Sequence, residues 1–243
     1  MGTAIIIPNV NWSERNFGRI HTSYDELSYI QKDLVFHLDG INKGTNEGKW
    51  TDLIGGVQWT SYGATSLENG WGFSNEAYML DDGTMGNYNY TSCTVEMCID
   101  SLTVDSNYFI FVGAGAGIVG CFVQSYYNES WFSIKQTTES VTRGALSVTP
   151  PISGTGKFTI SITGQTRGYG YWNGVKKSAD NVAYSAAPTA IIGKRVPSTS
   201  SGSALPFTGT IHSIRIYNRI LSNEEMLSNQ QVDNARFNLG LTI

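Results

Sequence analysis

Polar and hydrophobic residues alternate along most of this chain in short runs, the pattern of β-strands with one buried face. In the run Cys93–Asp100, for example, Val95, Met97 and Ile99 fall together on one face. The dipeptide Asn173–Gly174 predicts a tight type I′ hairpin turn, which needs positive φ at both residues. Strand-like runs recur about every 8–14 residues, which predicts an all-β sandwich. They cover residues 34–39, 55–60, 72–74, 93–100, 108–112, 120–126, 131–135, 157–163, 168–176, 190–193 and 211–217.

Helical signals are confined to the two ends of the chain. A capping box, Ser222 followed by Glu225, predicts a helix over about residues 222–235. The same spacing at Ser23–Glu26 predicts a short helix that continues to about Gln31. A strand-rich chain with helices only at its ends favours a sandwich over a fold of alternating strands and helices.

Several of these segments occur in the order found in one known family. The closing segment Phe207–Leu227 reads as a strand, the motif I-R-I-Y-N-R and a capped helix. Upstream lie Thr94–Ile99, Phe158–Ile162, Gly170–Val175 and Ile191–Lys194. Together these motifs resemble the laminin G-like, concanavalin A-like sandwich family.

The resemblance implies a fold and an organisation of the chain. We expect a concanavalin A-like jelly-roll β-sandwich over residues 31–243, with a short C-terminal helix and an N-terminal arm over residues 1–30. Members of this superfamily bind sugars, proteins or lipids, and some are glycoside hydrolases or lyases. Many carry a calcium ion in rim loops.

Composition and charge narrow the classes of partner. The 243 residues carry a net charge of −4, and the 16 Lys and Arg residues are scattered, so we expect no nucleic-acid partner. No apolar run approaches the roughly 20 residues that span a bilayer, so we expect no membrane insertion. The odd number of cysteines argues against a disulfide framework, and we expect Cys93, Cys98 and Cys121 to be reduced thiols, mostly in the core.

The N-terminus sets the cellular context that we expect. Met1–Pro8 lacks the basic region of a secretory signal. The opening Ala4–Ser13 is similar to the starts of phage and prophage proteins of gut bacteria. This similarity implies a virion-surface protein that assembles in the host cytoplasm and docks on other virion proteins through residues 1–30. Because virion fibres are often trimers, the similarity also implies a homo-oligomer as one option. The alternative to the virion surface is an extracellular or cell-surface location.

One pair of carboxylates is a candidate for catalysis. Laminarinase-type hydrolases on this fold carry several carboxylates on one strand, because a retaining mechanism needs two of them about 5 Å apart. The nearest arrangement here is Glu96 and Asp100, which share a strand face. The two carboxylates are either the catalytic pair of an unusual hydrolase or lyase, or part of an ordinary polar strand face. We predict that the chain is not an enzyme.

Two aromatic clusters are candidates for sugar binding, which uses flat rings beside amides and carboxylates. The first lies at a predicted hairpin tip and contains Tyr126, Tyr127, Asn128 and Trp131. The second contains Arg167, Tyr169 and Tyr171, with Trp172 on the opposite strand face. Either Trp172 or the two tyrosines are therefore expected in the core.

Loop carboxylates are candidates for calcium, which prefers hard oxygen ligands. Asp81–Asp82 is the best local pair, because adjacent carboxylates in a turn repel each other unless they are hydrated or neutralised. Asp39, Asn42 and Asp52 are further candidates. The alternative for all of them is a set of solvated acidic turns.

The sequence thus favours a non-catalytic module that recognises a glycan or host-surface receptor from the outside of a phage particle. Three alternatives stay open: a polysaccharide hydrolase or lyase, a purely structural virion decoration protein, and a fragment of a bacterial surface adhesin.

Overall fold

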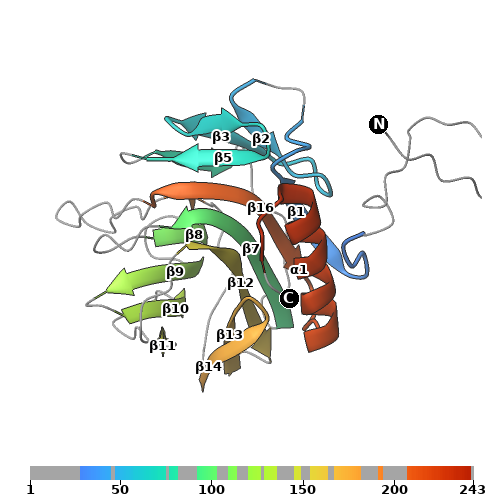
Figure 1. Ribbon diagram of the computed structural model, residues 1–243, viewed down its shortest axis with the longest axis vertical. Coiled ribbons are helices and arrows are strands. Elements are labelled where there is room, and N and C mark those ends of the chain that lie inside the picture. Colours follow the sequence, from blue (N-terminus) through green and yellow to red (C-terminus); the bar gives the residue numbers. More distant parts are fainter. Residues whose placement is uncertain are drawn as a thin grey trace, which may run out of the picture.

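The structure is a computed structural model, and it confirms an all-β sandwich with one C-terminal helix (Figure 1). It describes residues 28–44, 47–74, 77–81, 92–102, 109–113, 120–126, 129–135, 145–148, 154–163, 167–181, 191–193 and 207–241. The described strands form two sheets, and every pairing between named strands is antiparallel.

The first sheet has the order β14-β13-β12-β7-β16-β5-β4, and β1 also pairs with β16. Its strands are β1 (Leu34–Asp39), β4 (Thr65–Leu67), β5 (Gly70–Phe73), β7 (Ser92–Leu102), β12 (Gly154–Thr163), β13 (Arg167–Trp172), β14 (Val175–Asn181) and β16 (Gly209–Tyr217). The second sheet has the order β11-β10-β9-β8-β15-β6-β3-β2. Its strands are β2 (Lys49–Thr51), β3 (Gln58–Tyr62), β6 (Tyr78–Asp81), β8 (Phe109–Gly113), β9 (Gly120–Tyr126), β10 (Glu129–Lys135), β11 (Ala145–Val148) and β15 (Ile191–Ile192).

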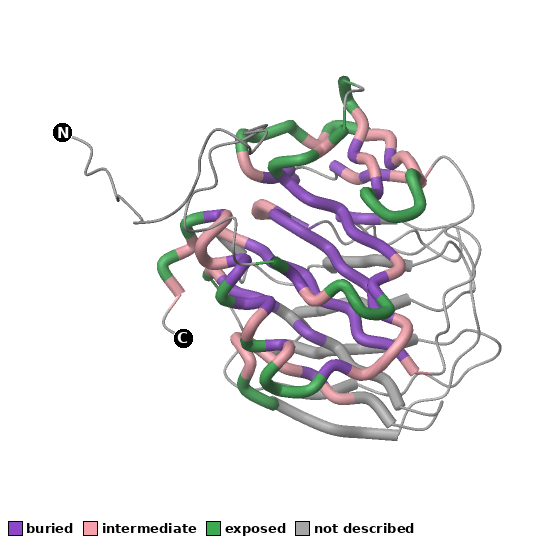
Figure 2. Tube along the Cα trace, turned by 90° about the vertical axis from the view of Figure 1, so that its right-hand side faces the viewer, coloured by how far each residue is buried: buried purple, intermediate pink, exposed green. Residues whose placement is uncertain are grey.

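The hydrophobic core lies between the two sheets, as the alternation predicts (Figure 2). Val95, Met97 and Ile99 of β7 are buried there. They meet residues of the second sheet, among them Trp59 and Met79. The two large faces are therefore joined by apolar contacts, which are the main stabilising contribution in such a sandwich.

A β-bulge in β16 reconciles its sequence with the core. Ile211 and Ile214 both face the core although they are three residues apart. The register against β7 shifts between Ile211 and Ser213, so His212 is an extra residue on this strand. Beyond the bulge, Ser213 and Arg215 point to the outer face of the first sheet, where they contact the helix.

The helix α1 (Asn223–Phe237) lies on that outer face, beside β7, β12 and β16 (Figure 1). The predicted capping box is confirmed: the Ser222 side chain accepts from the Glu225 backbone N–H, and the Glu225 carboxylate accepts from the Ser222 backbone N–H. Asn238 ends the helix in the left-handed conformation. Within the described part of the chain, no helix is long and apolar enough to cross a membrane.

Other local expectations have mixed outcomes. Asn173 and Gly174 have φ of 49° and 73°, which confirms the hairpin turn. The predicted helix does not reach Gln31, because residues 28–31 form no helix and Tyr29 instead packs on α1; residues 23–27 lie outside the described ones. Four short strands, β2, β4, β6 and β11, were not predicted, since three or four residues carry too little periodicity.

Two of the three cysteines lie in the protein interior as reduced thiols. Cys93 and Cys98 are free and buried, as expected. Burial raises the pKa of the Cys93 thiol to about 12, so this thiol is protonated and unreactive at neutral pH. The side chain of Cys121 is outside the described part.

Candidate functional site

A network of buried charges lies between β7, β12 and β16 on one side and α1 on the other. Glu96 accepts hydrogen bonds from Lys157 Nζ at 2.8 Å, Arg215 Nε at 3.1 Å and Asn229 Nδ2 at 2.8 Å. Arg215 also binds Asp233 through both terminal nitrogens, at 2.7 and 2.6 Å. The four ionisable side chains are fully buried and consist of two cations and two anions. The network is therefore neutral as a whole, which makes its burial tolerable.

The described start of the chain joins this network. The Tyr29 hydroxyl donates to Asp233 at 2.9 Å, and the Arg215 guanidinium lies 4.0 Å from the centre of the Tyr29 ring. The Ile30 backbone N–H donates to Asn229 at 3.0 Å. Although burial acts to raise it, the pKa of Asp233 stays below its usual value because Arg215 is adjacent. Residues 29 and 30, which we assigned to the arm, are thus attached to the helix face of the sandwich.

The two catalytic candidates have different environments. Glu96 is completely buried beneath α1, and its carboxylate is occupied by three donors. Asp100 is partly exposed and accepts a hydrogen bond from the Thr155 hydroxyl. The strand alternation places both on the same face, but this face is covered by the helix at Glu96. A polysaccharide has no path to the Glu96 carboxylate in this structure.

The calcium candidate Asp39 organises the turn after β1. Its carboxylate accepts from the backbone N–H groups of Ile41 and Asn42, at 2.8 and 2.9 Å. It also forms an ion pair of 2.6 Å with Arg236 of α1. These partners occupy the oxygens that a metal ion would need.

Asp52 has a similar role in the turn before β3. It accepts backbone N–H groups from His37, Ile54 and Gly55, at distances of 2.7, 3.1 and 2.7 Å. Burial raises the pKa of Asp52, and the three donors act against that rise. Its carboxylate closes a tight loop and is directed inward.

The remaining calcium candidates are described only in part. Asp81 is the last residue of β6, and Asp82 lies outside the described residues. Over the side chains that the structure places, no group of three or more His, Cys, Asp or Glu residues could hold a metal ion. A calcium site at Asp81–Asp82 stays a prediction.

The second aromatic cluster is divided between two layers. Trp172 packs against the core between the sheets, whereas Tyr171 packs against the smaller cluster beneath α1. The ammonium of Lys176 lies 4.3 Å from the centre of the Tyr169 ring. Trp172 is therefore the core residue of this cluster.

The first aromatic cluster is outside the described side chains. The backbones of Tyr126 and Trp131 lie in β9 and β10, which pair as the predicted hairpin. Tyr127 and Asn128 lie outside the described residues, and so does the side chain of Arg167 in β13. Their role in sugar binding stays a prediction.

The structure reveals a tyrosine pair that sequence reasoning missed. Tyr62 of β3 and Tyr78 of β6 are directly opposite in register, and their rings stack with centres 4.9 Å apart and planes at 8°. Tyr62 is 47% exposed. Their strand neighbours Trp59 and Met79 are in the core, so by alternation the pair faces outward from the second sheet. The two tyrosines are 16 positions apart in the sequence, and no local signal brings them together.

Polar residues share this outer face with the tyrosine pair. Thr60 lies between Lys49 and Leu80 in the sheet register. Lys49 Nζ donates to Gln58 at 3.0 Å on the same face. Flat rings beside amide, hydroxyl and ammonium groups are the combination expected of a sugar-contacting surface.

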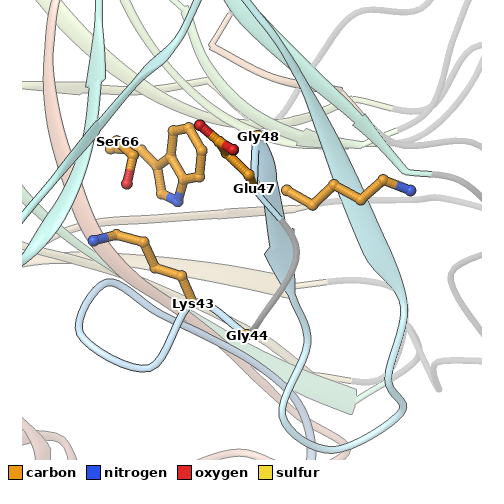
Figure 3. Close-up of a pocket in the computed structure, with 7 residues that line it drawn as sticks. Lys43, Gly44, Glu47, Gly48 and Ser66 are labelled. Carbon is orange, nitrogen blue, oxygen red and sulfur yellow. The ribbon is translucent and has the colours of Figure 1, made fainter.

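A small pocket, here called the edge pocket, opens where the second sheet ends at β2 (Figure 3). It is lined by Lys43, Gly44, Glu47, Gly48, Lys49, Ser66 and Trp71 and has a volume of about 220 Å³. In Figure 3 the side chains of Lys43 and Glu47, from the loop between β1 and β2, converge on the same space as Ser66 of β4. The pocket thus combines charged and hydroxyl groups above a tryptophan.

Comparison with known proteins finds similarity in structure only. No protein-family model and no curated protein matches the sequence. A structure of botulinum neurotoxin type C, whose cell entry depends on two ganglioside molecules, matches with a TM-score of 0.63 at 14% identity over 83% of this chain and 51% of that chain. The binding domain of botulinum neurotoxin DC in complex with SialylT matches with a TM-score of 0.62 at 12% identity, over 83% of this chain and 52% of that one.

An enzyme shares the same architecture. The sialidase of Trypanosoma rangeli in complex with 2,3-difluorosialic acid matches with a TM-score of 0.61 at 14% identity, over 84% of this chain and 33% of that chain. This chain therefore spans about half the length of the neurotoxin structures and a third of the sialidase. At such low identity the matches support a β-sandwich fold alone, and the laminin G-like resemblance rests on the sequence motifs.

Proposed function

We propose that this chain is a non-catalytic glycan-binding module whose sugar-contacting surface is centred on Tyr62 and Tyr78. The observation that carries the proposal is the stacked tyrosine pair, of which Tyr62 is exposed, on the outer sheet face with polar neighbours. A sugar ring can place its C–H face on Tyr62 while its hydroxyls reach Thr60. The gangliosides and SialylT of the neurotoxin structures agree with this proposal at the level of the fold.

The geometry also agrees with a module displayed on a particle. Tyr29 and Ile30 are attached to α1, which covers the first sheet, whereas the tyrosine pair faces outward from the second sheet. Tyr29 and Ile30 therefore contact the domain on the layer opposite the proposed sugar surface. We propose that residues 1–30 dock on other virion proteins of a phage and that the tyrosine face contacts the host surface.

A non-catalytic role agrees with the position of Glu96. A retaining or inverting glycosidase needs two carboxyl groups facing one sugar, and the Glu96 carboxylate is enclosed by Lys157, Arg215 and Asn229. Because the sialidase shares this fold, the experiment below includes a direct test for cleavage.

The test is affinity electrophoresis of the purified chain through gels that contain bacterial surface polysaccharides, with calcium or with EDTA. The Tyr62→Ala variant should lose about tenfold in affinity, because it removes the exposed ring. Leu227→Ala, on the exposed face of α1, is the matched control and should migrate as the unaltered chain does. Tyr169→Ala tests the competing aromatic cluster in the same gel.

Each outcome has a distinct meaning. Retardation that Tyr62→Ala abolishes and Leu227→Ala leaves intact supports the proposal, and loss of retardation with EDTA adds a metal to the site. New reducing ends in the gel overturn the non-catalytic role. If no polysaccharide retards the folded chain, glycan binding is refuted and a decoration protein becomes the leading alternative.

A further inference from the structure

The edge pocket has the chemistry of a polyol site. Its polar walls come from two separate segments of the chain: the loop after β1 with the start of β2, from Lys43 to Lys49, and β4. Trp71 lines the same pocket and is 2% exposed. An apolar floor with hydrogen-bonding walls suits a ligand that has both C–H and O–H groups.

Lys43 is held in place with a donor to spare. Its ammonium donates to the backbone carbonyls of Leu67 and, at 3.3 Å, Glu68. An ammonium has three N–H donors, so one remains for a ligand. Partial burial lowers the pKa of Lys43, in keeping with an amine that is only partly hydrated.

Glu47 and Ser66 complete the polar wall. Glu47 is exposed and makes no hydrogen bond or ion pair with the residues that the structure describes, so its carboxylate can accept from ligand hydroxyls. Ser66 is also exposed and can donate or accept. The Nε1–H of Trp71 is buried and has no acceptor among the described groups. Such a group is costly unless a partner reaches it.

The charge balance indicates a neutral ligand. Lys43 contributes one positive charge and Glu47 one negative charge. Lys49 also lines the pocket, but its ammonium is bound to Gln58 on the outer face of the sheet. A sugar hydroxyl can accept from a cation and donate to a carboxylate at once, so neighbouring hydroxyls on one ring satisfy both groups.

The size indicates a single sugar ring. The volume is about 220 Å³. It lies below the roughly 300–1,000 Å³ of sites for drug-sized ligands. A pocket of this size suits one pyranose ring, and a longer glycan would extend beyond it.

We propose that the edge pocket binds one neutral pyranose residue of a glycan, as a subsite separate from the tyrosine pair. This inference rests on the proposed glycan-binding function and extends it. The two sites are neighbours through β2: Lys49 pairs with Thr60, which is two residues before Tyr62 on β3. The step across from β2 to β3 and the two residues along β3 together place Lys49 and Tyr62 roughly 8 Å apart. One glycan can bridge this distance.

The test is a titration of the ¹⁵N-labelled full chain with the methyl pyranosides of glucose, galactose and mannose and with N-acetylglucosamine, followed by ¹H–¹⁵N correlation spectra. The reporters are the indole N–H of Trp71, assigned by its loss in Trp71→Phe, and the backbone amides of Gly44 and Gly48. We expect saturable shifts at these reporters for at least one sugar. Glu47→Gln should weaken that binding at least about tenfold, and Asp33→Asn, which removes the same charge from an exposed residue that does not line the pocket, should not.

The results separate the two proposals. Saturable shifts that Glu47→Gln abolishes support the pocket. If the chain is retarded by a polysaccharide while the pocket reporters do not move, the pocket inference is overturned and the glycan-binding function stands. Shifts that never saturate, or that survive Glu47→Gln unchanged, also overturn it. If neither retardation nor shifts occur in the folded chain, both proposals fail.

Discussion

The buried charge network makes a direct prediction for Glu96→Gln. This substitution keeps the size of the side chain but removes one negative charge, and it replaces one of the two acceptor oxygens by an NH2 group that faces a donor. Lys157 and Arg215 would then face Asp233 alone, which leaves one uncompensated positive charge beneath α1. We expect the variant to be strongly destabilised because a buried charge without a partner is costly.

The distances set the magnitude. Lys157 Nζ lies 2.8 Å from Glu96, and two unit charges at about this separation attract by about 6 kcal/mol at an effective dielectric constant of about 20. Desolvation offsets part of this attraction. Removing one partner of a buried pair typically costs about 3–5 kcal/mol, and at roughly 2–4 °C per kcal/mol the melting temperature should fall by roughly 6–20 °C.

The assay is urea unfolding followed by tryptophan fluorescence, with Glu68→Gln as an exposed control that should stay within about 0.5 kcal/mol of the unaltered chain. The double variant Glu96→Gln/Lys157→Met restores neutrality and should lose less than the sum of the single changes. A loss below about 1 kcal/mol for Glu96→Gln would refute the argument from charge balance. A stable Glu96→Gln variant that had lost a polysaccharide-cleaving activity would instead identify an enzyme.

Three further predictions concern the segments around the network. Tyr29→Phe removes the hydrogen bond to Asp233 and should cost about 1.5–3 kcal/mol in urea unfolding; an unchanged midpoint would mean that the chain start is not attached to α1. Ser222→Ala removes the helix cap and should cost about 1 kcal/mol by the same assay, with Ser222→Thr as the control that keeps the hydroxyl. Burial, together with the nearby Arg215 cation, lowers the pKa of His37 to about 4. His37 binds a proton near pH 6.5 in the unfolded state and only near pH 4 in the folded state. Its contribution to the free energy of unfolding should therefore be complete above pH 6.5, and up to about 3 kcal/mol should be lost as the pH falls to about 4. The loss of stability between pH 7 and 4.5 should be smaller in His37→Gln, and an identical loss in both chains would contradict the burial of a neutral imidazole.

Much of the local structure could be predicted from the sequence because its signals lie between neighbouring residues. Alternation placed Val95, Met97 and Ile99 on the core face of β7. The capping box at Ser222 and the turn at Asn173–Gly174 depend on backbone geometry within a few residues.

The candidate site could be predicted much less well. Alternation placed Glu96 on the polar face of β7, but it does not reveal that α1 covers this face. In the fold, Glu96 meets Lys157 and Asn229, which are 61 and 133 positions away. A side chain that reads as a catalytic candidate is therefore part of a buried ion network.

By itself, then, the sequence determined the strands, the closing helix and the sandwich class, since these follow from periodicity and capping. Only the tertiary structure decided which polar residues are buried and which surfaces are formed. Strand pairing stacks Tyr62 on Tyr78, and the segment from Lys43 to Lys49 forms the edge pocket together with β4 and Trp71. Both sites depend on contacts between residues far apart in the chain, and such contacts leave no pattern in a local window of sequence.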